Sequence, residues 1–311
     1  MSKELTDEAR NKAGKAQMQQ YLGSQYPEWH LVAIESIKKL ILNGNNFYAD
    51  LVTDDGPLSD IATTDNINIE IRTGWLYEAV SHAEQSIEDL FSLLMCAQSS
   101  DYFARDVVVY QAGKVKNYLW DFKADDLEYV LEQFHLPYSA LDDPWENENV
   151  FNAYKESVLM LQEYTKELIA FHKHYYQDYC QYKHGMAVSL RYGNSNPDKL
   201  TEGAFKTFDS YTVGARMKQT KSVPALCFDI VPETQPYLGA LHDEKNLLHY
   251  SLHAADIDKF EEITQKALLL LLPLRMNLIE MSKWDGTEKV KLIAFPTKKK
   301  SKIMRIGFPC G

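Results

Sequence analysis

Apolar side chains recur at helical spacing through the first part of the chain. In residues 28–42, Leu31, Ile34 and Ile37 begin a series of apolar positions three or four residues apart, which gives a helix one apolar face. Four further segments show the same spacing: 70–98, 102–110, 113–120 and 124–134. The pattern predicts amphipathic helices that bury their apolar faces against one another in a bundle.

The longest uninterrupted helical pattern covers residues 148–191. It contains no proline, and its only glycine, Gly185, falls late in the segment. At 3.6 residues per turn it corresponds to about twelve turns. A helix of that length is ordinarily a scaffold of the core, so we predict that it forms the centre of the bundle.

The pattern changes after residue 191. Residues 192–199 (YGNSNPDK) are rich in turn-forming residues and predict a linker. Short runs of β-branched and aromatic residues then predict strands, at 206–217, 223–231, 246–254, 290–296 and 302–309. A further helix is predicted over 256–281. The expected fold class is mainly α: a helical bundle with a long central helix, followed by a smaller α+β portion with short antiparallel strands.

Three parts are therefore expected along the chain. Residues 1–22 are polar and charged and predict a flexible N-terminal arm. Residues 23–191 are expected to form the helical bundle, and residues 200–311 an α+β segment packed on it.

Composition and charge narrow the classes of partner. Of 311 residues, 45% are hydrophobic and 25% are charged, as in ordinary globular proteins. The net charge of −11 disfavours a broad nucleic-acid surface, because phosphate neutralisation needs clustered Lys and Arg. The lysine-rich run 298–302 is a local exception. It is typical of a solvated strand edge, and a phosphate-contacting patch is the alternative.

Other features predict a cytoplasmic protein with no membrane span and no cofactor. The N-terminal segment MSKELTDEARNKAGKAQMQQ has no apolar stretch of the signal-peptide type. The apolar run 266–281 is too short for a span and contains Pro273 and Arg275. The four cysteines form no CxxC pair, which favours reduced thiols. P-loop, GxGxxG, GxSxG and HExxH motifs do not occur in the sequence.

The second half of the predicted long helix carries most of the candidate chemistry. Cys180 and His184, four residues apart, could share a metal as paired helical ligands do. His172 would lie roughly 18 Å from His184 along the helix, so it could not bind the same ion. The spacing supplies no further ligands, so no metal is expected. A neighbouring ladder of His174, Asp178 and Tyr182 fits ordinary side-chain contacts one turn apart.

The sharpest local pattern is Tyr182-Lys183-His184-Gly185. Lys183 could neutralise a phosphate, and His184 could act as a general acid/base. Glycine inside a helix needs a reason, which is either close helix packing or room for a ligand. On the 70–98 helix, Glu84 and Glu88 lie one turn apart and could hold a base, or could belong to a solvated face.

Together, the helix with Glu84 and Glu88 and the long helix ending in Tyr182-Lys183-His184-Gly185 resemble divergent HEPN-like domains over about residues 24–191. That superfamily consists of small α-helical bundles, common in bacterial toxin–antitoxin and phage-defence systems. Its active members are metal-independent endoribonucleases that pair their motifs across a dimer interface. The resemblance therefore implies a homodimer, with His184 as the histidine of the motif and Glu84 or Glu88 as the acidic residue of an earlier helix.

The chain departs from the family motif at one position. The family places an Arg four to six residues before its His, and residues 177–183 contain no Arg. Lys183 would have to supply the cation, although lysine lacks the bidentate fork of arginine.

Two hypotheses follow for the function. The net charge and the absent Arg favour a binding or interaction module with an RNA or protein partner, in a phage-defence or toxin–antitoxin setting. The density of the cluster favours the alternative, a metal-independent endoribonuclease. In that enzyme His184 would be the general acid/base for attack by a 2′-hydroxyl, and Lys183 would neutralise phosphate. Tyr182 or Tyr179 would position the substrate. We expect the first.

Overall fold

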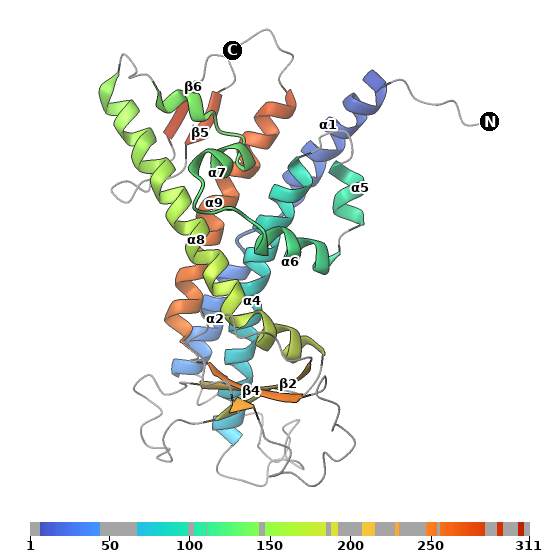
Figure 1. Ribbon diagram of the computed structural model, residues 1–311, viewed down its shortest axis with the longest axis vertical. Coiled ribbons are helices and arrows are strands. Elements are labelled where there is room, and N and C mark those ends of the chain that lie inside the picture. The colour runs from blue at the N-terminus through green and yellow to red at the C-terminus, as the bar shows by residue number, and fades with distance from the viewer. Residues whose placement is uncertain are drawn as a thin grey trace, which may run out of the picture. The chain divides into compact units, whose positions relative to one another are not determined.

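Helices dominate the part of the chain that the computed structural model describes (Figure 1). The described residues are 7–43, 67–98, 103–109, 111–142, 147–184 and 256–283, with the strand residues 188–191, 207–214, 228–229, 247–253, 291–294 and 304–307. The helices are α1 (Asp7–Ser24), α2 (Trp29–Asn43), α4 (Ile67–Ala97), α5 (Phe103–Val108), α6 (Ala112–Trp120), α7 (Leu127–Gln133), the 3-10 helix η2 (Tyr138–Leu141), α8 (Glu148–His184) and α9 (Ile257–Lys283). The mainly helical bundle predicted from apolar spacing is confirmed.

Strands are described in two antiparallel groups. The first has the order β1 (Val188–Arg191), β2 (Thr207–Gly214), β4 (Leu247–His253) and β3 (Phe228–Asp229). The second pairs β5 (Lys291–Ala294) with β6 (Met304–Gly307). That residues 200–311 form an α+β segment packed on the bundle stays a prediction.

The residues fall into two compact units, each defined by backbone positions that lie close together in space. Unit 1 comprises residues 1–30, 85–171 and 263–311, and unit 2 comprises residues 31–84 and 172–262. The predicted succession of arm, bundle and α+β segment along the chain stays a prediction.

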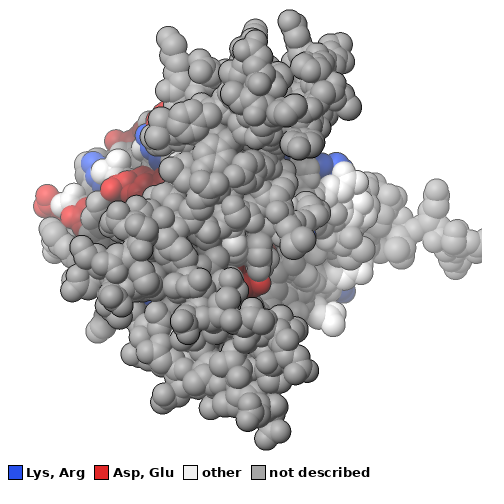
Figure 2. All heavy atoms as spheres, turned by 90° about the horizontal axis from the view of Figure 1, so that it is seen from below, with Lys and Arg blue, Asp and Glu red and all other residues white. Residues whose placement is uncertain are grey.

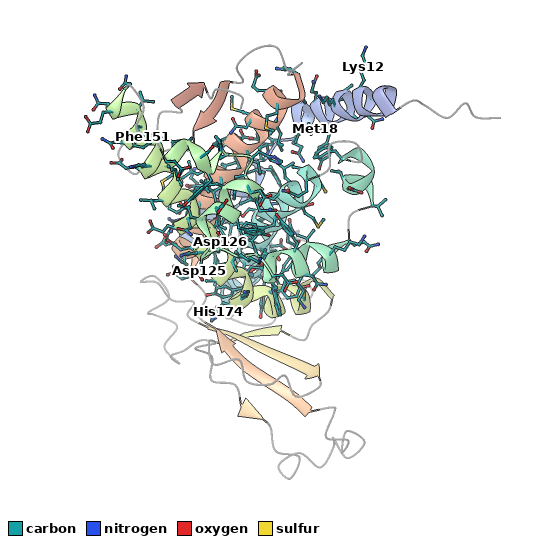
Figure 3. The ribbon with its side chains drawn as sticks, turned by 45° about the horizontal axis from the view of Figure 1, so that its top comes forward. Lys12, Met18, Asp125, Asp126, Phe151 and His174 are labelled. Carbon is teal, nitrogen blue, oxygen red and sulfur yellow. The ribbon has the colours of Figure 1, made fainter. Side chains whose placement is uncertain are left out.

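Within the predicted N-terminal arm over residues 1–22, the helix α1 begins at Asp7 and carries buried side chains. Met18 and Leu22, one turn apart, are buried, whereas Lys12 points away from the neighbouring helices (Figure 3). The Arg275 Nε of α9 donates a hydrogen bond to the Leu22 carbonyl oxygen, which satisfies a carbonyl in the last turn of α1. These contacts come from distant residues, so the polar local sequence gave no sign of them.

A seam of buried residues runs along α8. Its members alternate at steps of three and four: Phe151, Tyr154, Val158, Leu161, Thr165, Leu168, His172, Tyr175 and Tyr179. This spacing keeps one helix face turned toward its neighbours over many turns. Two members are polar. The Thr165 hydroxyl finds its hydrogen-bond acceptor within the helix, because Oγ1 donates to the Leu161 carbonyl oxygen at 2.8 Å. The His172 side chain needs a partner from another element.

The predicted end of the long helix at residue 191 is wrong. The helix α8 ends at His184, and Val188–Arg191 form β1, which pairs with β2 through Val188 and Ser210. Glycine is favoured directly after a helix, and Gly185 is the next residue in the sequence. The β-branched Val188 also suits a strand better than a helix.

The core of unit 1 contains a cluster of aromatic rings from α4, α6 and the start of α7. The Phe91 and Phe122 ring centroids are 5.3 Å apart, and those of Tyr118 and Phe122 are 5.7 Å apart, both edge to face. Edge-to-face pairs add to the stabilisation that burial itself provides. The Tyr118 hydroxyl donates to Gln133 Oε1 at 2.7 Å, and burial raises the pKa of that phenol well above its ordinary value.

The helix α7 ends in a Schellman motif. The N–H of Leu136 donates to the Leu131 carbonyl oxygen at 2.8 Å, and that of His135 to the Glu132 carbonyl oxygen at 3.0 Å. His135 has a φ of 55°, the left-handed conformation that this motif requires. Pro137 follows, so the helix cannot continue. The end of α7 thus has a defined geometry.

The start of α7 provides a matched test of helix capping. The Asp126 side chain accepts the Tyr129 N–H at 3.1 Å as the N-cap, whereas its neighbour Asp125 pairs with Lys166 and is 98% exposed (Figure 3). We expect Asp126→Ala to lower the free energy of opening of α7 by about 1 kcal/mol, because an amide loses its cap. Asp125→Ala should change it by less than about 0.5 kcal/mol. Hydrogen exchange of the α7 amides measures both, and equal effects would contradict the capping role.

Candidate functional site

The residues predicted to carry chemistry at the end of the long helix belong to the last turns of α8. Lys183 is exposed, and its Nζ lies 3.5 Å from the Tyr179 hydroxyl and 5.4 Å from the centroid of that ring. Tyr182 and His184 belong to the same helix, but their side chains lie outside the described residues, as does Gly185. Among the described side chains at this helix end, Lys183 is thus an exposed cation.

Glu84 contacts His172, a residue to which the sequence analysis assigned no role. Its Oε2 is 2.7 Å from His172 Nδ1, and the two side chains are separated by 88 positions in the chain. Both side chains have an exposed fraction of 0%. Since isolated charges are very costly to bury, such a pair is held together by its mutual hydrogen bond. The contact joins α4 to α8 within unit 2.

The surroundings of His172 are aromatic. The centroids of the His172 and Tyr176 rings are 4.8 Å apart, and the neighbouring Tyr175 packs edge to face on Phe260 of α9 with centroids 5.5 Å apart. A dyad with no exposed surface cannot touch a macromolecular substrate in this conformation. We therefore interpret Glu84–His172 as a structural link between helices.

Glu88, one turn after Glu84 on α4, is also buried, with 8% of its surface exposed. The alternative of a solvated face for these two carboxylates is thus wrong. Whether either one takes part in catalysis stays a prediction.

The described residues show neither a metal cluster nor a membrane-spanning helix. Among them, no group of three or more His, Cys, Asp or Glu side chains is arranged to hold a metal ion. No described helix combines the length and the apolar character needed to cross a bilayer.

A hollow that sequence analysis did not foresee lies in unit 1, at the corner between α1 and α2. It has a volume of about 110 Å³ and is lined by Gln25, Tyr26, Pro27, Asp89 and Leu271. The Trp29 N–H donates to the Tyr26 carbonyl oxygen at 3.2 Å, which closes the turn that leads into α2. The lining residues come from the corner, from α4 and from α9, so no single stretch of sequence contains the hollow.

Aromatic side chains around this corner are exposed. Tyr26 exposes 62% of its surface, Trp29 53% and Tyr21 36%. The Tyr21 ring packs edge to face on Phe103 of α5, with centroids 5.8 Å apart, and Figure 1 shows α5 beside α1. We call Tyr21, Tyr26 and Trp29 the corner aromatics. Among the described residues, Tyr138 is the one other aromatic side chain with comparable exposure, at 40%.

The charged group of the hollow is Asp89. Its carboxylate is 54% exposed, and Oδ2 lies 3.2 Å from His30 Nε2. Burial raises the pKa of the Tyr21 phenol, and the negative charge of Asp89 raises it further. The phenol therefore stays neutral at physiological pH. Asp89 is thus a negative charge at the edge of a partly apolar hollow.

Comparisons with known proteins give no relative for this chain: no family model, curated protein or solved structure matches it. The function must therefore be argued from the chain's own residues.

The buried dyad makes a prediction about stability. We expect Glu84→Leu or His172→Leu to lower the free energy of unfolding by about 3–5 kcal/mol, because each leaves its former partner buried without it. The double substitution should cost less than the sum of the two, since a buried pair can be replaced by apolar residues at little cost. Urea unfolding of the four proteins measures the coupling.

A matched control is available in the same unit. Lys259 and Glu262 form an ion pair at 3.1 Å with exposed fractions of 41% and 48%. Lys259→Ala should cost less than about 1 kcal/mol, as is typical of surface pairs. Single dyad substitutions no more costly than this control would contradict a linking role for Glu84 and His172.

Proposed function

We propose that this protein is a helical interaction module that binds a partner protein at the α1–α2 corner. One observation carries the proposal: the corner aromatics are exposed beside a hollow that contains a carboxylate. Exposed Tyr and Trp side chains beside a pocket are typical of protein-binding surfaces, where such residues supply most of the binding energy.

The charges favour a protein over a nucleic acid as the partner. The net charge is −11, and Asp89 at the hollow would repel phosphates. At the left of the face drawn in Figure 2, described Lys and Arg side chains lie beside Asp and Glu side chains. The hollow is also smaller than the about 300–1,000 Å³ of typical cofactor sites.

The resemblance to HEPN-like domains suggests the setting. We propose that the module acts in a bacterial phage-defence or toxin–antitoxin system, in the cytoplasm, and as a homodimer. The mainly helical architecture is compatible with that family, and sedimentation velocity on the purified chain tests the dimer.

The interaction surface can be tested by site-specific cross-linking. A photoreactive phenylalanine analogue at position 26 should cross-link a specific protein in the native host, whereas the same analogue at position 138 should not. Tyr138 is a matched control, an exposed tyrosine of η2 with 40% of its surface exposed. The cross-linked protein is then identified and purified.

The affinity between this protein and its purified partner then tests the proposal. We expect Tyr26→Ala and Trp29→Ala each to weaken its affinity by about tenfold or more, the effect of losing an aromatic anchor. Tyr138→Ala should leave the affinity unchanged. Equal cross-linking from positions 26 and 138, or an affinity that survives both corner substitutions, would sink the proposal.

A second candidate function is a metal-independent endoribonuclease that uses His184. The observation in its favour is that Lys183 is exposed at the end of α8, where a substrate phosphate could reach it. Against it, the carbonyl end of a helix carries partial negative charge and disfavours an anion.

The enzyme is tested by incubating the purified chain with a mixed RNA pool in EDTA. If the enzyme hypothesis holds, wild type cleaves RNA and His184→Ala reduces the rate by about a hundredfold or more, as expected for loss of a general acid/base. Lys173→Ala, an exposed lysine of α8, serves as the control and should retain the rate. No cleavage by a folded wild-type protein would eliminate this candidate.

A further inference from the structure

We infer that the hollow at the α1–α2 corner receives a cationic side chain, lysine or arginine, of the partner protein. This inference rests on the proposed function and names the chemistry that the partner must present.

Asp89 provides the charge that a cation would meet. A carboxylate can accept about four hydrogen bonds, and the contact with His30 Nε2 uses one position on Oδ2. The carboxylate is 54% exposed, so a partner can reach it. A charge-assisted hydrogen bond between Asp89 and a guanidinium or ammonium group is about twice as strong as one between neutral groups.

Tyrosine rings complete the recognition of a cation. Tyr26 lines the hollow, and Tyr21 is close enough to Asp89 for the carboxylate to affect the pKa of its phenol. The face of a tyrosine ring attracts a cation within about 6 Å of its centroid. Pro27 and Leu271 add apolar walls, against which the methylene groups of a long side chain can pack.

The size of the hollow selects a side-chain head over a larger ligand. A volume of about 110 Å³ accommodates a guanidinium or ammonium group with part of its aliphatic stem. The hollow is open at the surface, so the rest of the partner can lie on the corner aromatics.

Two described side chains near the hollow, His30 and Arg275, do not remove its preference for a cationic side chain. His30 already contacts Asp89. Arg275 lies one turn beyond Leu271 on α9, and its Nε donates to the Leu22 carbonyl oxygen of α1. Its guanidinium is therefore directed at the end of a helix.

Charge also decides between a foreign partner and a second copy of this chain. A second copy carries the same net charge of −11 and brings no net attraction to Asp89, so the proposed homodimer is expected to form through another surface. A basic segment of another protein is attracted both by the net charge and by Asp89. We therefore assign the hollow to a basic partner.

Short peptides test the inference on the intact chain. The probes are three peptides of the form Gly-Ser-X-Ser-Gly with blocked ends, in which X is arginine, lysine or citrulline. Citrulline has nearly the shape of arginine but no charge. Binding is followed by the NMR shifts of the Tyr26 and Trp29 amides in protein labelled on Tyr and Trp, assigned by substitution of each residue.

We expect the arginine and lysine peptides to shift both amides with saturation, and the citrulline peptide to bind about tenfold or more weakly, because the charge-assisted bond is lost. Raising the NaCl concentration should weaken the two cationic peptides and leave citrulline unaffected. Asp89→Asn should abolish the preference for charge, whereas Asp142→Asn, an exposed aspartate at the end of η2, should retain it.

Several outcomes would overturn the inference. These are equal shifts from arginine and citrulline, no shifts up to about 20 mM peptide, and an unchanged charge preference in Asp89→Asn. The salt and citrulline comparisons use wild type, so they decide the matter even if Asp89→Asn fails to fold.

The outcomes also separate this inference from the proposed function. If an identified partner loses affinity with Tyr26→Ala but binds Asp89→Asn as tightly as wild type, the corner is an interaction surface without a cation site. If the partner is insensitive to Tyr26→Ala and Trp29→Ala as well, both proposals fail. A cross-link from position 26 only to a second copy would likewise contradict a basic partner.

Discussion

The contact between Glu84 and His172 is the constraint on which unit 2 depends. A carboxylate and an imidazole without exposed surface must keep their 2.7 Å contact, because separating them would leave a polar group buried at a cost of several kcal/mol. This requirement fixes how α8 is turned relative to α4 within the unit. It also places Tyr175 against Phe260. The polar side chains at this part of α8 therefore serve packing first.

The same constraint explains why the densest chemical cluster in the sequence is a poor guide to a site. His172 occupies the seam of α8, and Tyr175 and Tyr179 are buried beside it. Among the described side chains at the end of the helix, Lys183 is exposed, and its ammonium lies over the Tyr179 ring. A nuclease built here would have to work with the last turn of α8 alone, without the buried dyad.

Local periodicity was enough to predict the helices but not their ends or their partners. Apolar spacing predicted α2 and α4 because their buried faces follow the helical repeat. It did not predict α1, whose Leu22 carbonyl oxygen accepts a hydrogen bond from Arg275 at a distant position in the sequence. It extended α8 through Val188–Arg191, which pair with β2 instead. The role of His172 could have been found from the alternation of three and four residues, which places it on the buried face of α8. No local rule could have paired it with a glutamate 88 positions away.

The hollow at the α1–α2 corner lies beyond sequence analysis for a similar reason. Its walls combine Tyr26, Asp89 and Leu271 from three separate elements, and none of these residues belongs to a motif. Exposure is what gives them meaning, because a tyrosine or a tryptophan in sequence does not show whether it will be buried. In the folded chain the buried polar pair stabilises the scaffold, and the exposed aromatics remain available for a partner. This separation of buried polar groups from exposed aromatic groups favours binding over catalysis. Binding needs a rigid surface with accessible groups, whereas acid–base catalysis would require the titratable pair itself to reach the substrate.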